Sequence, residues 1–145
     1  GDVFLKRLLP IFKASFFVPL FGDGSTKFQP VFIDDVSLAV EKIITDNIEG
    51  QGIYELAGSR AISYKDFYNY ISKCLNKTRV LVPTPLNLIK PIISIAEKTP
   101  FSPLTSEQLL LFEKDNIIQN IDKSFKDLEI SPQDTLQITK NIIEN

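Results

Sequence analysis

The absence of histidine restricts the chemistry that this chain could perform. None of the 145 residues is a histidine, so Ser-His-Asp and Cys-His catalysis are excluded for these residues alone, and zinc sites of the usual Cys/His kind lack ligands. Cys74 is the single cysteine, and without a histidine to activate it we expect a small core residue on a helix face. A lone cysteine cannot form an internal disulfide, which fits a reducing compartment.

One amide side chain interrupts an apolar segment. The run from Phe28 to Ile33 is apolar except for Gln29 and is predicted as a β-strand, with Pro30 confining it to an edge or a bulge. Because a buried amide needs hydrogen-bond partners, we expect Gln29 to face a pocket. Asp34 or Asp35 can accept the first free amides of the helix that follows, and we predict Asp35 to be its structural cap.

The turn before this strand and the helix after it together indicate an α/β fold. Gly22 and Gly24 permit a tight turn, and the helix is expected to end near Asn47. Two more short strands are predicted over residues 53–57 and 78–82, the second ended by Pro83.

Hydrophobic periodicity and capping residues predict the other helices. Ser63 is expected to cap one helix, and Thr105 with Gln108 forms the pattern of a capping box for another. The predicted helices cover residues 4–12, 64–75, 86–97 and 105–112, with a last helix starting at Pro132. The helix over residues 86–97 is apolar nearly all round, so it must be buried or pressed against a partner.

The composition favours one packed domain without a membrane span. Hydrophobic residues make up 43% of the chain, and the net charge of -2 gives no attraction to nucleic acid or an anionic membrane. The longest apolar stretch, Leu86 to Ala96, falls short of the roughly 20 residues that a bilayer requires. The chain opens at Gly1 without an initiator methionine, and we expect it to be a fragment of a longer protein.

The order of four motifs resembles the carboxy-terminal half of extended or atypical short-chain dehydrogenase/reductases. The motifs are the glycine-rich turn, the KFQPV run at residues 27–31, the DDV run at 34–36 and the GIYELAG run at 52–58. Within these proteins the chain is most similar to the NAD(P)-binding, epimerase-like group that includes the Rossmann-type accessory subunit of respiratory complex I. Residues 104–116 and 125–128 are similar to the closing helix and the final packed turn of that family.

This resemblance implies a fold and a cofactor. It implies the C-terminal part of a Rossmann-type fold, mostly helical with a few short strands and lacking the N-terminal dinucleotide-binding half. NADP or NAD would bind the full-length protein, and none is expected on this chain, because the glycine-rich cofactor turn and the catalytic Tyr-x-x-x-Lys pair lie in the missing half. Neither Tyr64 with Lys65 nor Tyr70 with Lys73 has that spacing. Residues 1–145 are therefore expected to form a single substrate-binding or lid subdomain that is inactive alone.

The resemblance also implies a substrate border at Lys27, Phe28 and Gln29. An arginine is common in the family where Lys27 stands, and lysine keeps the charge but loses bidentate recognition of phosphate or carboxylate. This difference weakens the inference of a nucleotide-sugar substrate. A solvated turn lysine explains Lys27 equally well.

Three functions follow from the resemblance. The leading one is the substrate-side domain of an NAD(P)-binding short-chain dehydrogenase-like protein, which the resemblance also links to NADH dehydrogenase (complex I). The first alternative is a non-catalytic accessory or assembly protein of complex I. The second alternative is a nucleotide-sugar epimerase or dehydratase. The expected partners are its own N-terminal Rossmann half, a small-molecule substrate or respiratory-complex subunits, without nucleic acid. The expected location is the cytoplasm, or the periphery of the inner membrane with complex I. Exposed apolar helices are expected to favour homo-oligomers.

Overall fold

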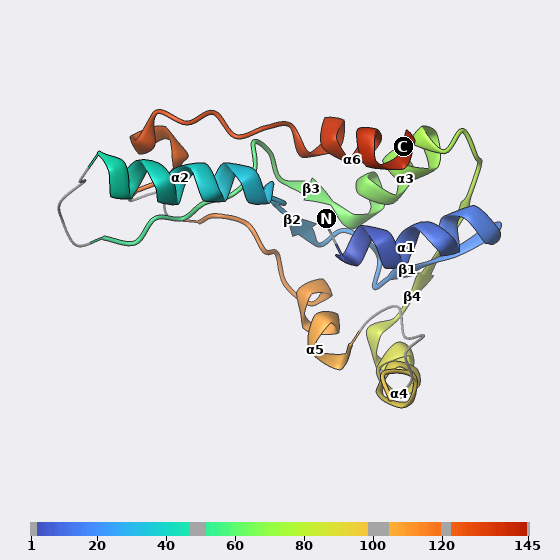
Figure 1. Ribbon diagram of the computed structural model, residues 1–145. Coiled ribbons are helices and arrows are strands. Elements are labelled where there is room, and N and C mark those ends of the chain that lie inside the picture. The colour runs from blue at the N-terminus through green and yellow to red at the C-terminus, as the bar shows by residue number, and fades with distance from the viewer. Residues whose placement is uncertain (1–2, 47–51, 99–104, 120–122, 145) are drawn as a thin grey trace.

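The computed structural model describes residues 3–46, 52–98, 105–119 and 123–144 of the chain. The fold is mixed α/β and mostly helical, with short strands, as the sequence predicts (Figure 1). Leu104, the first residue of the segment that is similar to the family's closing helix, lies outside the described part, as do Gly1 and Asp2.

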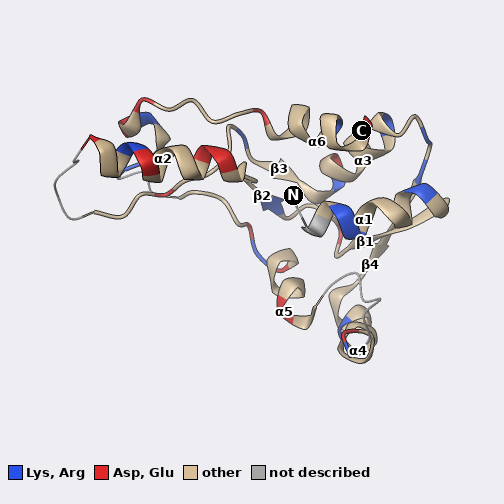
Figure 2. Cartoon of the chain, viewed as in Figure 1, with Lys and Arg blue, Asp and Glu red and all other residues tan. Residues whose placement is uncertain are grey.

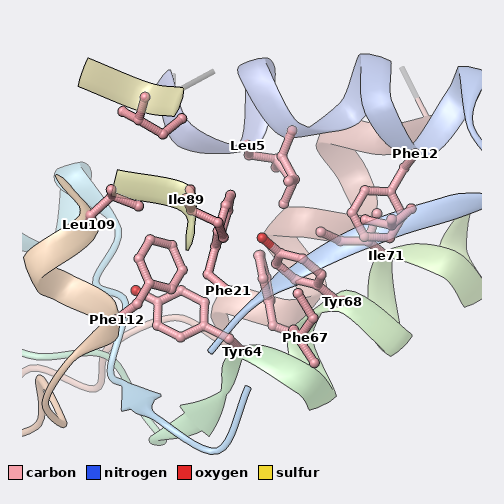
Figure 3. Close-up of a cluster of buried hydrophobic side chains, with 14 residues drawn as sticks. Leu5, Phe12, Phe21, Tyr64, Phe67, Tyr68, Ile71, Ile89, Leu109 and Phe112 are labelled. Atoms are coloured by element: carbon pink, nitrogen blue, oxygen red, sulfur yellow. The ribbon is translucent and has the colours of Figure 1, made fainter. Parts of the chain in front are cut away.

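The main hydrophobic core lies between α1 (Val3–Ala14), α3 (Tyr64–Cys74) and a pair of strands. On α1, Leu5, Leu8 and Phe12 follow helical spacing and are all buried. On α3 the same spacing buries the side chains that Figure 3 shows pointing toward those of α1. These α3 residues are Tyr64, Phe67, Tyr68 and Ile71.

Two short sheets hold this core. The strands β1 (Phe17–Phe21) and β4 (Val80–Thr84) are parallel, and α2 (Ile33–Thr45) and α3 lie between them in sequence. Val18 on the inner face of β1 is fully buried, whereas Phe17 on the outer face is exposed. The second sheet is antiparallel and joins β2 (Lys27–Phe28) to β3 (Ile62–Ser63).

Four helical elements close the core on its remaining sides. Ile89 and Ile93 of α4 (Leu86–Ala96) are buried, and Leu109 and Phe112 follow from α5 (Ser106–Leu109) and the 3₁₀-helix η1 (Leu110–Phe112). The helix α6 (Thr135–Glu144) packs against α3. Two predicted caps are confirmed: Ser63 Oγ accepts a hydrogen bond from the amide of Asp66, and Thr105 with Gln108 forms a capping box.

A second, smaller cluster lies under α2 (Ile33–Thr45). Ala39 of this helix is fully buried against Phe125 and Leu128 of the 3₁₀-helix η2 (Phe125–Leu128). Half-buried side chains from residues 31, 36, 43, 54, 56 and 130 surround these three. Ala39 therefore marks the inner side of α2.

Several boundaries differ from the sequence prediction. Instead of a strand to Ile33, β2 ends at Phe28, after which the chain remains extended without strand pairing. Residues 53–57 form no strand, and among the residues that the structure describes they make one parallel bridge, between Tyr54 and Lys123. The last helix begins at Thr135 instead of Pro132.

The strand β4 passes through Pro83, where the sequence predicted its end. The amide of Val80 donates to Phe16 O on the β1 side, and strand amides alternate in direction. The nitrogen of Pro83 therefore lies on the open edge of the pair, where its missing hydrogen costs no ladder bond.

Candidate functional site

The candidate site surrounds the extended segment that leads from β2 into α2. This segment carries the predicted site residues Lys27, Phe28 and Gln29, and one pocket lies beside Gln29 while another lies beside residues 30–33. Hydrogen bonds to two neighbouring residues fix its start: the amide of Lys27 donates to the side-chain oxygen Asp115 Oδ1 at 2.8 Å, and the amide of Gln29 donates to the main-chain oxygen of Asn116 at 3.1 Å.

Gln29 faces a hollow of about 570 Å³. Both the nitrogen and the oxygen of its side-chain amide make hydrogen bonds within the protein. Its Nε2 donates to Gly58 O at 2.8 Å, and its Oε1 accepts the amide of Ile118 at 3.4 Å. The expectation that this buried amide needs partners is therefore met by main-chain groups. Gln29 joins two distant segments at the edge of the hollow, and one of the two N–H groups of its Nε2 is used by the bond to Gly58 O.

Glu55 is a polar residue of this hollow that the sequence analysis missed. Its Oε2 is buried and has no hydrogen-bond partner among the described residues. The sequence does carry a signal for this residue, because Glu55 is the charged residue in the apolar run from Ile53 to Ala57. Gln29 stands out in its own apolar run in the same way. A carboxylate oxygen without a partner can accept a hydrogen bond from a hydroxyl or an amine.

Phe28 lies in the aromatic part of the core. Its ring stacks on that of Tyr64 with centroids 4.3 Å apart and meets Phe67 edge-on at 5.3 Å. Tyr64 in turn lies 4.3 Å from Phe112. The side chain of Lys27 is exposed. Neither Lys27 nor Phe28 lines a pocket found beside the segment, so their place at a substrate border stays a prediction.

The prediction that Asp35 caps α2 is wrong. The helix begins earlier, at Ile33, and its N-cap residue Phe32 makes no side-chain capping bond. Asp35 lies inside the first turn, only 5% exposed, and accepts two hydrogen bonds from Gln133. The helix begins at Ile33, whereas a cap at Asp35 would require it to begin at Val36, so Asp35 lies inside the first turn and makes a tertiary contact.

The second pocket is apolar and encloses about 360 Å³ between α1, the extended segment and α6. Its two hydroxyl groups point to main-chain acceptors: Thr135 Oγ1 donates to Pro30 O at 2.6 Å and Thr139 Oγ1 to Thr135 O at 2.8 Å. Apolar side chains form the rest of its wall, among them Leu5, Val31, Ile138 and Ile142.

Charges are spread over the chain with both signs mixed (Figure 2). Within the described ranges, no group of three or more acidic, cysteine or histidine residues could hold a metal ion. No helix in those ranges has the length and apolar character needed to cross a membrane. Cys74, the last residue of α3, is half-buried and unpaired.

Comparison with solved structures defines the class of fold. The NADPH-dependent quinone oxidoreductase QOR2 of Escherichia coli, solved with NADPH, superposes on 97% of this chain with a TM-score of 0.71 and 14% identity, and 50% of that enzyme is covered. A second structure, gox2253, matches 99% of the chain with a TM-score of 0.57 and 17% identity, over 43% of its own length. The fold is thus that of about half of a Rossmann-type NAD(P)-binding protein.

Comparison in sequence finds two curated relatives that are named as subunits of NADH dehydrogenases. The chain is 28% identical over 120 residues to the mitochondrial NADH-ubiquinone oxidoreductase 40 kDa subunit of Neurospora crassa, covering 82% of this chain and 32% of that protein. It is also 28% identical over 127 residues to the mitochondrial NADH dehydrogenase [ubiquinone] 1 alpha subcomplex subunit 9 of Arabidopsis thaliana, covering 80% of this chain and 31% of that subunit. No protein-family model matches the sequence.

The chain is a distant homologue of these complex I subunits, which the resemblance to extended short-chain dehydrogenase/reductases anticipated. It spans about a third of the length of the curated relatives it matches.

Proposed function

We propose that this chain is the substrate-side part of a longer NAD(P)-binding protein of the short-chain dehydrogenase type. The observation that carries the proposal is the superposition of nearly the whole chain on half of an enzyme solved with NADPH. We assign the substrate to the hollow beside Gln29 and Glu55, where one carboxylate oxygen has no hydrogen-bond partner among the described residues.

A second candidate is a non-catalytic accessory subunit of complex I, and the names of both curated relatives favour it. In that role the outer side of α4 is the docking surface. Leu88, Ile92 and Ile95 follow helical spacing and are exposed, while Ile89 and Ile93 anchor the helix in the core. The longer protein would then lie at the periphery of the inner membrane with the complex.

A nucleotide-sugar epimerase or dehydratase is the third candidate, and it is the least favoured. Neither curated relative carries such a name. The lysine at position 27 also lacks the bidentate donors that suit a diphosphate.

Thermal unfolding with NADPH tests the cofactor part of the proposal. A ligand at about 100 times its dissociation constant stabilises a protein by about 2.7 kcal/mol. The longer protein is expected to show a saturable shift with NADPH or NADH, while residues 1–145 alone show none. A saturable shift of the isolated chain at micromolar cofactor, or no shift of the longer protein, contradicts the proposal.

Fractionation of native membranes separates an enzyme from an accessory subunit. An accessory subunit co-migrates with complex I, and an Ile92→Lys variant is expected to release it while Asn87→Lys, at an exposed position of the same helix, is the matched control. If the longer protein carries an intact Tyr-x-x-x-Lys pair and reduces a substrate without co-migration, the enzyme is favoured. In that case Lys27→Ala is expected to raise KM, with the exposed Lys65→Ala as control.

A further inference from the structure

The surface where α1 ends and α3 leads into β4 carries positive charge without negative charge. Residues 3–22 and 67–96 contain lysine and arginine but neither aspartate nor glutamate, although the chain as a whole mixes both signs. Figure 2 shows the lysine and arginine residues of these segments in blue. We refer to this surface as the basic end, and its residues are Lys13, Lys73, Lys77 and Arg79.

The neighbouring helix leaves this charge uncompensated. The helix α6 packs on α3, and its two charged residues, Lys140 and Glu144, form an ion pair at 3.8 Å. The basic end therefore keeps its positive charge, although the net charge of the whole chain is -2. Such a charge attracts an anionic surface over about one Debye length, which is roughly 10 Å at about 0.1 M salt.

A hollow of about 490 Å³ lies in the basic end, between the last turns of α3 and the loop that follows. Lys73, Lys77 and Arg79 supply cations to its lining, Asn69 and Asn76 supply amides, and no carboxylate lines it. A phosphate group fits this set of donors, because its oxygens are negatively charged and accept hydrogen bonds from ammonium, guanidinium and amide groups.

Hydrogen bonds to the end of α1 hold two of these cations in place. Arg79 Nε donates to Phe12 O at 2.6 Å, and Lys77 Nζ donates to Lys13 O at 3.1 Å. Arg79 also donates to Thr78 O through its NH1 nitrogen at 3.0 Å. A guanidinium has five N–H groups and an ammonium three, so both side chains keep donors for an anion.

Exposed apolar side chains continue from the hollow along the outer face of β1 and β4. Val80 follows Arg79 directly and pairs with Phe17. Phe16 and Phe17 are 54% and 61% exposed, and their rings lie edge-on with centroids 5.2 Å apart. Val80 and Val82 are exposed on the other strand. Basic residues next to exposed aromatic and aliphatic side chains are typical of proteins that bind at an anionic membrane surface.

We propose that the basic end binds the surface of a membrane that contains anionic phospholipids. A headgroup phosphate occupies the hollow, and the rings of Phe16 and Phe17 enter the boundary between headgroups and acyl chains. This inference goes beyond the proposed function and does not rest on it, because none of the residues around this hollow lines the pocket beside Gln29.

The apolar face favours a lipid surface over other anionic partners. A free phosphorylated metabolite would fill the hollow but would leave Phe16 and Phe17 exposed. Single-stranded nucleic acid stacks bases on aromatic rings, but the aliphatic side chains of Val80 and Val82 offer it no stacking surface. An anionic bilayer contacts the cations, the rings and the aliphatic side chains together.

Sedimentation of the longer protein with vesicles tests the partner. The protein is expected to bind vesicles of phosphatidylcholine mixed with phosphatidylglycerol, and to bind pure phosphatidylcholine at least about tenfold more weakly. Raising the salt to about 1 M, where the Debye length is about 3 Å, is expected to release it. Equal binding to the two kinds of vesicle, or binding to neither, overturns the proposal.

A pair of substitutions on α3 tests the charge. Lys73→Gln is expected to weaken vesicle binding about fivefold, which is the usual contribution of one basic residue near an anionic surface. Lys65→Gln makes the same change of charge at the opposite end of α3 and is the matched control, expected to leave binding unchanged. Both side chains are exposed, and equal urea midpoints of the two variants check that the fold is kept. Equal weakening in both variants overturns the role of the basic end.

A second pair tests the aromatic contact. Phe17→Gln is expected to weaken vesicle binding at least about fivefold, because the ring no longer enters the interface. Ile44→Gln removes a side chain that is 73% exposed on α2 and is the control. Inorganic phosphate that binds the protein, together with vesicle binding that Phe17→Gln leaves unchanged, identifies a free phosphate ligand and overturns the proposal. Binding of a single-stranded RNA homopolymer in place of vesicles also overturns it.

Cofactor titration of the same sample separates this inference from the proposed function. NADPH binding without vesicle binding overturns only the membrane contact. Vesicle binding without binding of NADPH or NADH overturns only the cofactor function. The vesicles contain no protein, so their binding does not depend on an association with complex I.

Discussion

The carboxylate of Asp35 accepts two hydrogen bonds from Gln133, one from its main-chain amide at 2.9 Å and one from its Nε2 at 3.0 Å. The two residues lie 98 positions apart, so this contact ties the first turn of α2 to the segment that enters α6. It fixes one end of the extended segment that the two pockets flank.

Replacement of Asp35 is expected to destabilise the fold. Asp35→Ala removes a buried acceptor and leaves the Gln133 donors without their partner, which costs about 1–3 kcal/mol in the free energy of unfolding. Urea denaturation measures this change. Asp34→Ala, at the exposed neighbouring position, is the control and is expected to change stability by less than about 0.5 kcal/mol. Equal losses in the two variants would show that Gln133 contributes nothing.

The error over Asp35 shows where sequence reasoning reaches its limit. Periodicity predicted α2, α3 and α4 because their apolar positions repeat within a few residues, and Ser63 was found because a cap acts on the amide three residues later. The bond between Asp35 and Gln133 depends on how distant segments meet, and no local pattern encodes that. The same holds for residues 53–57, whose strand character requires a neighbour.

The predicted site shows the same division. Gln29 was found from its polarity in an apolar run, and its partners Gly58 and Ile118 could only be seen in three dimensions. Phe28 belongs to the same short run but stacks on Tyr64. The KFQPV motif at residues 27–31 indicates that this segment is important for the fold. It does not indicate the direction in which each side chain points.

Tyr68→Phe is expected to stabilise the protein. The Tyr68 side chain is fully buried, and its hydroxyl has no hydrogen-bond partner in the described residues. Removing an unsatisfied buried hydroxyl while keeping the ring is expected to raise the free energy of unfolding by about 1 kcal/mol. Urea denaturation provides the measurement, with Tyr70→Phe at a half-buried position of the same helix as control. A loss above about 1 kcal/mol would indicate a partner for the hydroxyl.

Stability is expected to fall at alkaline pH because of Tyr64. Burial raises the pKa of Tyr64 from 10 to about 12, and burial also raises the pKa of Tyr68. A folded-state pKa above the unfolded one means that the folded state keeps its proton longer, so the contribution is complete below pH 10 and disappears between pH 10 and 12. At about 1.4 kcal/mol per pH unit the loss from Tyr64 is about 3 kcal/mol.

The Tyr64→Phe variant isolates this effect from other alkaline titrations. Its unfolding free energy is expected to decline less steeply than that of the natural protein between pH 10 and 12, measured by urea denaturation at each pH. Any hydrogen bond lost with the hydroxyl offsets the two curves at all pH values and does not change this difference in slope. Parallel curves across that interval would contradict the raised pKa.

Residues 1–145 alone are expected to self-associate. The outer sides of α2 and α4 expose isoleucine, leucine and valine, and contiguous apolar surface of this kind drives association. Light scattering is expected to show dimers or larger species. The Ile92→Lys and Val40→Lys substitutions should lower the average mass, and Glu41→Lys should not. A stable monomer at micromolar concentration would contradict this expectation.

Gly58→Ala is expected to disrupt the candidate site most strongly. A Cβ at this position would overlap the carbonyl oxygen of Pro30 and come within 3.1 Å of Thr135 Oγ1, and backbone atoms cannot move aside as a flexible side chain can. Overpacking of this kind is expected to cost about 3 kcal/mol and to break the bond between Gln29 Nε2 and Gly58 O. Gly52→Ala is the control, because its Cβ would meet only the flexible end of Lys123. Urea denaturation should show a large loss for Gly58→Ala and a small one for Gly52→Ala; similar losses would mean that the segment carrying Pro30 can shift freely.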